Sequence, residues 1–292
     1  MTARTTGAPA YAGPVDLDRY GRYDPFRGMT DRSVPPAYDF DGRIGDAAHP
    51  AEPGRYHLYV ALSCPVAQLA RIARLLLGLE NVIGVSVVDD DRDGRGWAFR
   101  ERRGPDEVNG FTLLSQAYEA SRPGYSGHIS VPVLWDRHEG RILSNQYFNI
   151  LRDIGTQFGA YATSDVQLYP QELAGRIDAV NTLIYEEISL ALSATAKRHE
   201  DVRPQVIAAL DQFDARLATH RYLLGDAITE ADLRFYTTLV RFDQGGNALS
   251  SITGRPLPSW ERLHRYVQDL FALPAFRETT LVVPEWLADA RP

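Results

Sequence analysis

The pattern of apolar and polar positions becomes regular at residue 56 and predicts a strand–helix–strand unit. The run Tyr56–Leu62 is almost continuously apolar, as expected for a strand that is buried on both faces. Residues 66–79 carry apolar side chains at helical spacing, and Val82–Val88 is rich in β-branched residues. A strand, a helix and a second strand in this order form a βαβ unit with parallel strands.

The next segment predicts a long connection followed by a hairpin. Residues 89–128 are polar and rich in Gly and Arg, with one short helix expected at 111–120. Strands are expected at 131–135 and 141–144, joined by a turn, and a helix at 145–158. A connection as long as 89–128 is uncommon unless it serves a function.

The second half of the chain has helical periodicity only. The predicted helices lie in 170–196, 203–219, 229–243 and 259–272, with starts marked by Pro170, Pro204, Pro258 and Pro274. We therefore predict a fold of the α/β plus all-α class. The expected division is an extended N-terminal arm at 1–54, an α/β domain at 55–160 and an all-helical domain at 165–285.

Composition narrows the functions that this 292-residue chain can have. A single cysteine excludes an internal disulfide, a CxxC pair and a thiolate zinc site, and the histidine spacing gives no metal motif. A net charge of −7 without a basic cluster argues against nucleic acid as a partner. No apolar run reaches the ~18 residues of a membrane span, and residues 1–18 lack the apolar core of a secretory signal. We therefore expect a cytoplasmic protein.

Cys64 stands between the first strand and the first helix and is the candidate nucleophile. At a helix start, free backbone N–H groups and the helix dipole stabilise thiolate over thiol, which lowers the pKa of a cysteine. Pro65 suits the first helical turn because its missing N–H is not needed there. The alternative is a buried cysteine that behaves as a small hydrophobe, but the strand–Cys–Pro–helix context favours a reactive thiol.

Pro132 stands at the start of a predicted strand, where a proline is often tolerated in a cis peptide. A cis-proline facing a cysteine-bearing helix start is the thioredoxin-like arrangement, in which the preceding loop offers backbone groups to a peptide-like thiol. An ordinary proline of an edge strand is the alternative interpretation.

Two other motifs are expected to be structural. Thr229 and Asp232 have the spacing of a capping box at the start of an apolar helix. The acidic triplet Asp89-Asp90-Asp91 is expected to form a solvated turn rather than a cation site.

In combination these motifs resemble the cytosolic glutathione transferases, and most of all their xi class, the glutathionyl-hydroquinone reductases. The resemblance covers residues 20–280. The matching stretches are Gly54–Val60, Ser63–Pro65, Tyr125–Gly127, Val131–Asp136, Leu168–Pro170, Tyr222–Asp226, Thr229–Asp232, Thr237–Asp243 and, in the arm, Tyr23–Arg27.

The resemblance implies a thioredoxin-like N-terminal domain, an all-helical glutathione transferase C-terminal domain and a homodimer. It also implies that Cys64 attacks the sulfur of a thiol-conjugated hydroquinone and keeps the thiol as a mixed disulfide, which a second small thiol resolves. Val131 and Pro132 would present backbone to the thiol. Trp97 matches a tryptophan that packs on the bound thiol in the family.

The sequence departs from the family pattern at positions that recognise ligands. His128 replaces an arginine, and Gln146 and Tyr147 replace a Glu-Ser pair that binds the γ-glutamyl end of glutathione. The lost carboxylate removes a charge-assisted hydrogen bond worth about 1.5–3 kcal/mol. Two substrate-site tyrosines of the family fall at Ser193 and within 244–246, where this chain has none.

Three hypotheses stay open. The chain is a xi-like enzyme that uses another thiol such as mycothiol, a glutathione-dependent enzyme for an unusual aromatic conjugate, or a non-catalytic relative that binds a ligand or partner. Lys197 is the only lysine among 31 basic residues, which indicates a GC-rich genome and fits the first hypothesis.

Overall fold

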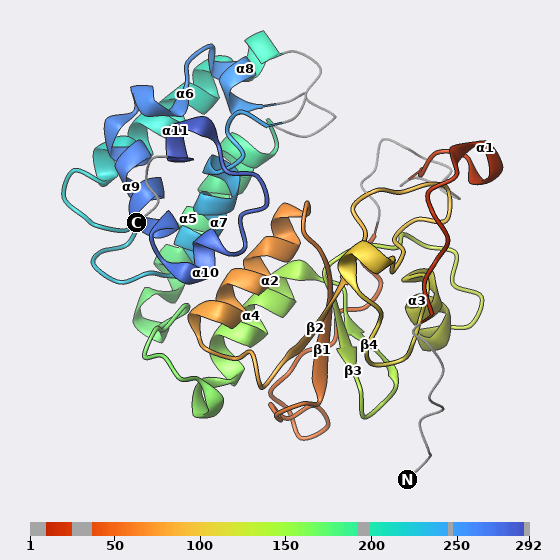
Figure 1. Cartoon of the computed structure of the whole chain (residues 1–292). Coiled ribbons are helices and arrows are strands. Elements are labelled where there is room, and N and C mark those ends of the chain that lie inside the picture. The colour runs from red at the N-terminus through yellow and green to blue at the C-terminus, as the bar shows by residue number, and fades with distance from the viewer. Residues whose placement is uncertain (1–9, 25–36, 192–198, 245–247, 289–292) are drawn as a thin grey trace. The chain divides into compact units, whose positions relative to one another are not determined.

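The computed structural model describes residues 10–24, 37–191, 199–244 and 248–288, and Figure 1 shows their helices and strands. The chain forms two compact units: residues 1–67 with 80–150, and residues 68–79 with 151–292. The second unit thus includes a segment from early in the chain, whereas the expected bounds 55–160 and 165–285 divide the chain sequentially. These bounds stay a prediction.

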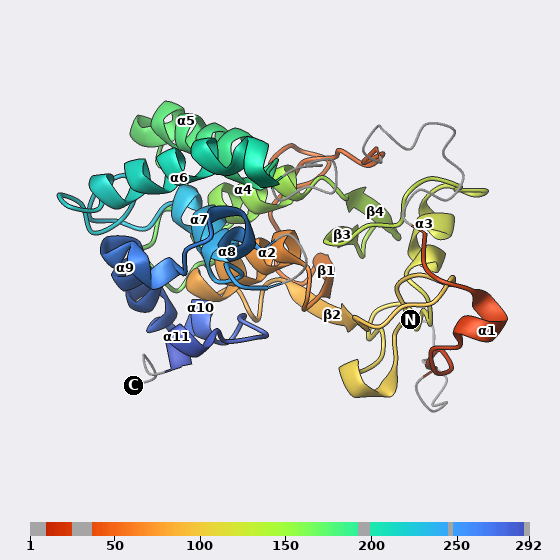
Figure 2. The ribbon, with the colours of Figure 1, turned by 90° about the horizontal axis from the view of Figure 1, so that it is seen from above.

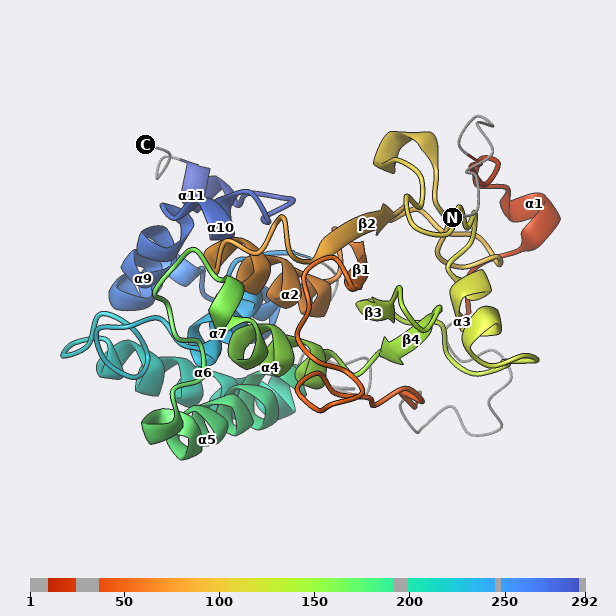
Figure 3. The same cartoon turned by 90° about the horizontal axis from the view of Figure 1, so that it is seen from below.

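The first unit contains a four-stranded mixed sheet with the order β2-β1-β3-β4 (Figure 3). β1 (Tyr56–Ala61) pairs in parallel with β2 (Gly84–Val88) and antiparallel with β3 (Val133–Asp136). A turn joins β3 to β4 (Arg141–Ser144), so the predicted hairpin is confirmed. All six residues of β1 are buried, which explains why its sequence is apolar without alternation.

Helices follow the strands as the periodicity predicts. α2 (Pro65–Leu76) follows β1, and α4 (Tyr147–Gln157) follows β4. The connection after β2 contains a 3-10 turn at Glu101–Arg103 and the short helix α3 (Ser115–Ser121). The βαβ unit and a thioredoxin-like arrangement of strands and helices are therefore confirmed.

The described part of the arm is fastened to the rest of the first unit. Its helix α1 (Leu17–Tyr20) is preceded by Asp16, whose backbone N–H donates to the Asp93 carboxylate at 3.0 Å. Farther along, Asp41 forms an antiparallel bridge with Ser144 at the end of β4. The arm residues Pro25, Phe26 and Arg27, which belong to a matching stretch, lie outside the described residues.

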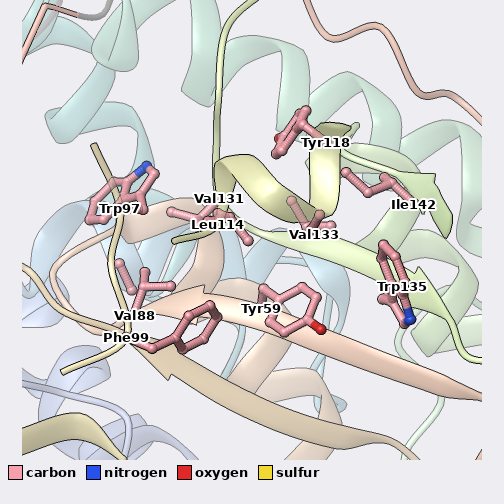
Figure 4. Packing of buried hydrophobic residues seen from close by; sticks show 12 residues of the cluster. Tyr59, Val88, Trp97, Phe99, Leu114, Tyr118, Val131, Val133, Trp135 and Ile142 are labelled. Atoms are coloured by element: carbon pink, nitrogen blue, oxygen red, sulfur yellow. The ribbon is translucent and has the colours of Figure 1, made fainter. Parts of the chain in front are cut away.

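An aromatic-rich core lies within the first unit (Figure 4). It combines side chains from β1, β3 and the connection after β2, among them Tyr59, Trp97, Phe99 and Trp135. Cys64 packs against the same core from its edge. The candidate nucleophile therefore packs against buried apolar and aromatic side chains.

The second unit contains only helices among its described residues. They are α2 from residue 68 on, α4 from residue 151 on, α5 (Ala174–Ile184) with a π-helical turn at Tyr185–Ser189, α6 (His199–Arg216), α7 (Glu230–Leu239), α8 (Leu249–Thr253), α9 (Glu261–Phe271), α10 (Pro274–Arg277) and α11 (Glu285–Ala288). α7 packs against α5 and α9 and is buried along most of its length (Figure 2). The predicted all-helical half is confirmed. In the described part of the chain no helix is long and apolar enough to cross a membrane.

The start of α7 has the predicted capping box. The backbone N–H of Thr229 donates to the Asp232 carboxylate at 2.8 Å, and the same carboxylate accepts from Leu223 N at 2.9 Å and from Tyr266 Oη at 2.9 Å. Burial raises the pKa of Asp232 above its ordinary value, although these donors act in the opposite direction. The carboxylate therefore organises the helix start through neutral partners alone.

The helix starts that were predicted from the positions of prolines are confirmed only in part. Pro274 opens α10, but Pro204 lies inside α6, where the helix loses one backbone hydrogen bond and continues. Pro170 precedes a 3-10 turn at Gln171–Leu173 that continues directly into α5, and Pro258 lies in a 3-10 turn at Leu257–Ser259 before α9. Proline fixes its own φ, but whether a helix extends in front of it depends on packing that the local sequence does not encode.

Candidate functional site

Cys64 lies at the junction of β1 and α2, directly before the first helical residue, Pro65. The backbone N–H of Cys64 donates to the Ala61 carbonyl at 3.3 Å, and this turn presents the thiol at the helix start. Its Sγ lies 3.6 Å from the Val131 carbonyl oxygen, within hydrogen-bonding range for a thiol donor. The thiol is half-buried, so a small ligand can reach it.

The loop before β3 is held from behind while its backbone faces the thiol. The Val131–Pro132 peptide bond is cis, as predicted. Tyr118 Oη lies 3.0 Å from the Ser130 carbonyl, to which it donates, and it accepts from Ser130 N at 3.0 Å. Burial raises the pKa of Tyr118 to about 12, so the phenol keeps the proton that it donates. The Tyr118 hydroxyl thus fixes the backbone next to Val131, while the Val131 side chain is buried in the aromatic-rich core.

Trp97 belongs to the same apolar core as Val131, and 7% of it is exposed. The Arg92 guanidinium lies 3.9 Å from the centre of the Trp97 ring and 4.3 Å from the centre of the Tyr23 ring. Tyr23 comes from the arm, and its Oη lies 3.5 Å from the Ile129 carbonyl oxygen. Arg92 is therefore held between an aromatic ring of the core and one of the arm.

Gln146 and Tyr147, at the start of α4, both contact Tyr38 of the arm. Gln146 Nε2 donates to the Tyr38 carbonyl at 3.1 Å, and the rings of Tyr147 and Tyr38 meet edge to face at 6.2 Å. The neighbouring Asn145 donates to Ser130 Oγ at 3.3 Å, which ties this helix start to the loop before β3.

His128 is linked to the arm through one tyrosine. The Tyr125 hydroxyl lies 2.7 Å from an Asp39 carboxylate oxygen and 3.1 Å from the His128 carbonyl. The predicted site residues thus form two groups. We call Cys64, Pro65, Val131 and Pro132 the sheet side, and Trp97, His128, Gln146 and Tyr147, which meet the arm directly or through one residue, the arm side.

The acidic triplet after β2 is not the solvated turn that the sequence predicted. Asp89 is 2% exposed, and Arg102 Nε donates to its carboxylate at 2.8 Å. Burial opposes ionisation of Asp89, but the Arg102 hydrogen bond, the Asp91 backbone N–H and the charges of Arg102 and Arg100 together hold its pKa below the ordinary value. The triplet is instead part of a charged network with arginines of the connection 89–128.

Asp90 is the member of the triplet that reaches the thiol region. Its carboxylate accepts from Ser63 N, the residue before Cys64, at 2.9 Å, and pairs with Arg103 at 2.8 Å. Sequence reasoning missed Asp90, Arg92 and Tyr23 as neighbours of the site. The one available signal was the basic group at 100–103, which follows the acidic triplet along the chain and neutralises it.

One group of potential metal ligands occurs among the described residues: His49, Asp136 and Glu139. Asp136 is the buried member of this group, and it is already bound by Arg55, whose Nε donates to the Asp136 carboxylate at 3.0 Å. A guanidinium at this distance repels a cation, so the cluster does not suit a metal.

Comparison with known proteins agrees with this geometry. Residues 196–269 match the family described as "Glutathione S-transferase, C-terminal domain". The chain is 37% identical over 205 residues to "Glutathionyl-hydroquinone reductase PcpF" of Sphingobium chlorophenolicum. The aligned region covers 68% of this chain and 66% of the PcpF protein, which is just under two thirds of the length of PcpF. It is 34% identical over 246 residues to "Glutathionyl-hydroquinone reductase YqjG" of Escherichia coli, covering 82% of this chain and 75% of that protein.

Solved structures give the same answer. The glutathione transferase Xi of Phanerochaete chrysosporium superposes with a TM-score of 0.77 at 33% identity, covering 84% of this chain and 83% of that one. The glutathione-bound structure of YqjG superposes with a TM-score of 0.75 at 34% identity, covering 82% and 80%. The chain therefore belongs to the glutathione transferase superfamily and, within it, to the xi class of enzymes that includes the glutathionyl-hydroquinone reductases.

Proposed function

We propose that this protein removes glutathione from a glutathionylated hydroquinone through a mixed disulfide on Cys64. The observation that carries the proposal is the sheet side, where a half-buried thiol at a helix start faces the Val131 carbonyl beside a cis-proline. Free N–H groups at the helix start favour the thiolate that such a reaction needs. Similarity to enzymes named glutathionyl-hydroquinone reductases favours this chemistry over a non-catalytic role.

The reaction consumes one free glutathione for each conjugate. The Cys64 thiolate attacks the sulfur of the conjugate, the bond between sulfur and the aromatic carbon breaks, and that carbon takes up a proton. An S–S bond now joins Cys64 to glutathione. A second glutathione thiolate attacks this disulfide, releases Cys64 and leaves as glutathione disulfide. The aromatic compound gains two electrons as the glutathionyl sulfur of the conjugate and the sulfur of one free glutathione join in glutathione disulfide.

The Val131 backbone is suited to orient the cysteinyl part of the bound thiol. Trp97 and His128 are suited to line the thiol site next to it. Gln146 offers a neutral amide where the family has a carboxylate, so the γ-glutamyl ammonium is bound more weakly here. The alternative co-substrate, mycothiol, rests on this change and on the arginine bias. We further propose that the protein acts in the cytoplasm, where its free thiol stays reduced, and as a homodimer.

Intact-mass spectrometry tests the proposal directly. After incubation with glutathionyl-hydroquinone, the wild-type protein should gain the mass of one glutathionyl group while hydroquinone is released, and Cys64→Ser should gain nothing. Parallel incubations with glutathione disulfide and mycothiol disulfide identify the thiol. If hydroquinone is released at the same rate by Cys64→Ser, the mixed-disulfide mechanism is wrong. The rate of iodoacetamide alkylation against pH supplies a second readout, since an ordinary thiol titrates at about 8.5.

A further inference from the structure

We propose that a cavity beside the thiol site, built by the N-terminal arm, binds an anionic group on the aromatic part of the substrate. This inference rests on the proposed function and names its substrate class: hydroquinone conjugates that carry a carboxylate on the ring. The cavity belongs entirely to the first unit and involves residues for which the family resemblance assigns no role.

The cavity has a volume of about 530 Å³. One wall comes from the arm and the other from the loop after β2, and the lining includes Val15, Leu17, Arg22, Tyr23, Asp90 and Arg92. Val15 and Leu17 are 37% and 45% exposed, which is unusual for two large apolar side chains so close together. Apolar side chains and the Tyr23 ring suit an aromatic ligand.

Three contacts place this cavity next to the thiol. Asp90 accepts from the backbone of Ser63, the residue before Cys64. Tyr23 reaches the carbonyl of Ile129, two residues before Val131. Arg92 lies on Trp97, which shares the apolar core with Val131 and Cys64. These contacts join the walls of the cavity to residues beside Cys64 and Val131, so a ring attached to a thiol ligand at Cys64 lies near the cavity.

The lining also includes Asp91, so it carries two arginines and two carboxylates. Its two carboxylates have arginine partners outside the lining, because Asp90 pairs with Arg103 at 2.8 Å and Asp91 pairs with Arg102 at 2.7 Å. Arg92 contacts two aromatic rings, which leave its charge in place, and neither it nor Arg22 has a carboxylate partner within the described ranges. The cavity thus places two cations beside the apolar side chains of Val15 and Leu17.

This combination selects for an ionised aromatic compound. A carboxylate can pair with the guanidinium groups while the ring packs against Val15, Leu17 and Tyr23. A neutral hydroquinone would leave both cations without a partner, and a cationic ring would be repelled. The thiol ligand also carries carboxylates, so the test must separate the two sources of negative charge.

The test compares two conjugates with the same thiol: glutathionyl-hydroquinone and the glutathionyl conjugate of 2,5-dihydroxybenzoate, its carboxylated counterpart. The readout is the ratio of kcat/KM for the carboxylated over the neutral conjugate. Arg22→Gln and Arg92→Gln should each lower this ratio about tenfold, since each removes a charge-assisted partner. Arg19→Gln is the matched control, because Arg19 is an exposed arm arginine that does not line the cavity.

Two outcomes overturn the inference. The ratio could stay within about twofold in both variants. Alternatively, both conjugates could lose activity equally, which would assign the arginines to the thiol instead of the ring. Should the wild-type protein turn over neither conjugate, the proposed function fails, and calorimetric titration with 2,5-dihydroxybenzoate alone still decides the cavity. Binding that weakens in both arginine variants but not in Arg19→Gln supports it, and equal or absent binding rejects it.

Discussion

The sheet side and the arm side of the site are built by different means. On the sheet side, backbone geometry places Cys64 against Val131, and the partners are a helix start, a strand and a buried tyrosine. On the arm side, side chains meet the arm through aromatic and charged contacts. Three positions at which the sequence departs from the family pattern, His128, Gln146 and Tyr147, belong to the arm side.

The two sides therefore differ in what they contribute: the sheet side carries the groups of the proposed reaction, and the arm side carries the positions that would select the ligand. A thiolate reaction needs one sulfur, an ordered backbone and a helix start, and any change there affects every substrate. The arm contacts the sheet itself through the bridge between Asp41 and Ser144, whereas Asp16 and Tyr38 contact the connection after β2 and the start of α4. The arm side is therefore the part of the site where a new substrate preference can evolve.

The largest effect is expected from a substitution that affects the sheet side alone. Cys64→Ser should lower kcat/KM by about a thousandfold or more, because a hydroxyl at this position is not ionised and forms no disulfide. Ser63→Ala is the control, since the Ser63 contribution to the site is its backbone N–H. Steady-state kinetics with a glutathionylated hydroquinone measures kcat/KM of both variants. Equal values would contradict the role of the sheet side in the chemical step.

The second prediction concerns a substitution that affects the arm side alone. Asp93 is fully buried and accepts from Asp16 N at 3.0 Å and from Arg95 Nε at 3.0 Å, so it anchors the arm. Asp93→Asn should lower the free energy of unfolding by about 3 kcal/mol because it leaves buried arginine charge without a partner. Iodoacetamide should still alkylate Cys64 of the folded variant at the wild-type rate. Urea unfolding checks the first point, with Asp91→Asn as the exposed control.

The same anchor predicts a pH dependence. The Arg95 hydrogen bond holds the pKa of Asp93 well below its ordinary value of 3.8, against the opposing effect of burial. A carboxyl with a lowered pKa in the folded state contributes stability that is fully present above 3.8 and is lost as the pH falls below it. Acid unfolding of Asp93→Asn should therefore be less steep between about pH 4 and pH 2 than that of the wild-type protein.

A smaller change should sharpen recognition. Gln146→Glu restores a carboxylate at the start of α4 and should lower the KM for glutathione about tenfold by pairing with its ammonium group. Gln157→Glu makes the same charge change at the exposed end of α4 and should leave the KM unchanged. Equal values for both variants would show that position 146 does not face the thiol.

The smallest prediction concerns the second unit. Thr229→Ala removes one side-chain partner of the α7 capping box and should lower the free energy of unfolding by about 1 kcal/mol. Thermal unfolding measures the loss. The specific activity of the folded variant should equal that of the wild-type protein, because Thr229 supports the helix start only.

Local patterns predicted most of the fold and the sheet side. β1, α2 and the hairpin follow from periodicity, and Cys64 with Pro132 from the junctions at which they stand. Asp90 and Arg92 could not be predicted, because their partners Ser63 and Tyr23 are 27 or more residues away along the chain. Charge pairing over such distances depends on the folded loop, and no periodicity reports it. The family positions at Ser193 and Gly245-Gly246 lie outside the described residues.

The stacking of Arg92 on Trp97 gives the protein an optical signal of its own. A positive charge held over an indole alters the energy of its excited state, so displacement of Arg92 or of the Tyr23 ring should shift the emission of Trp97. Trp97→Phe identifies this contribution among the four tryptophans of the chain. Docking of the arm, and entry of a ligand beside it, can then be followed by fluorescence in real time without any added label.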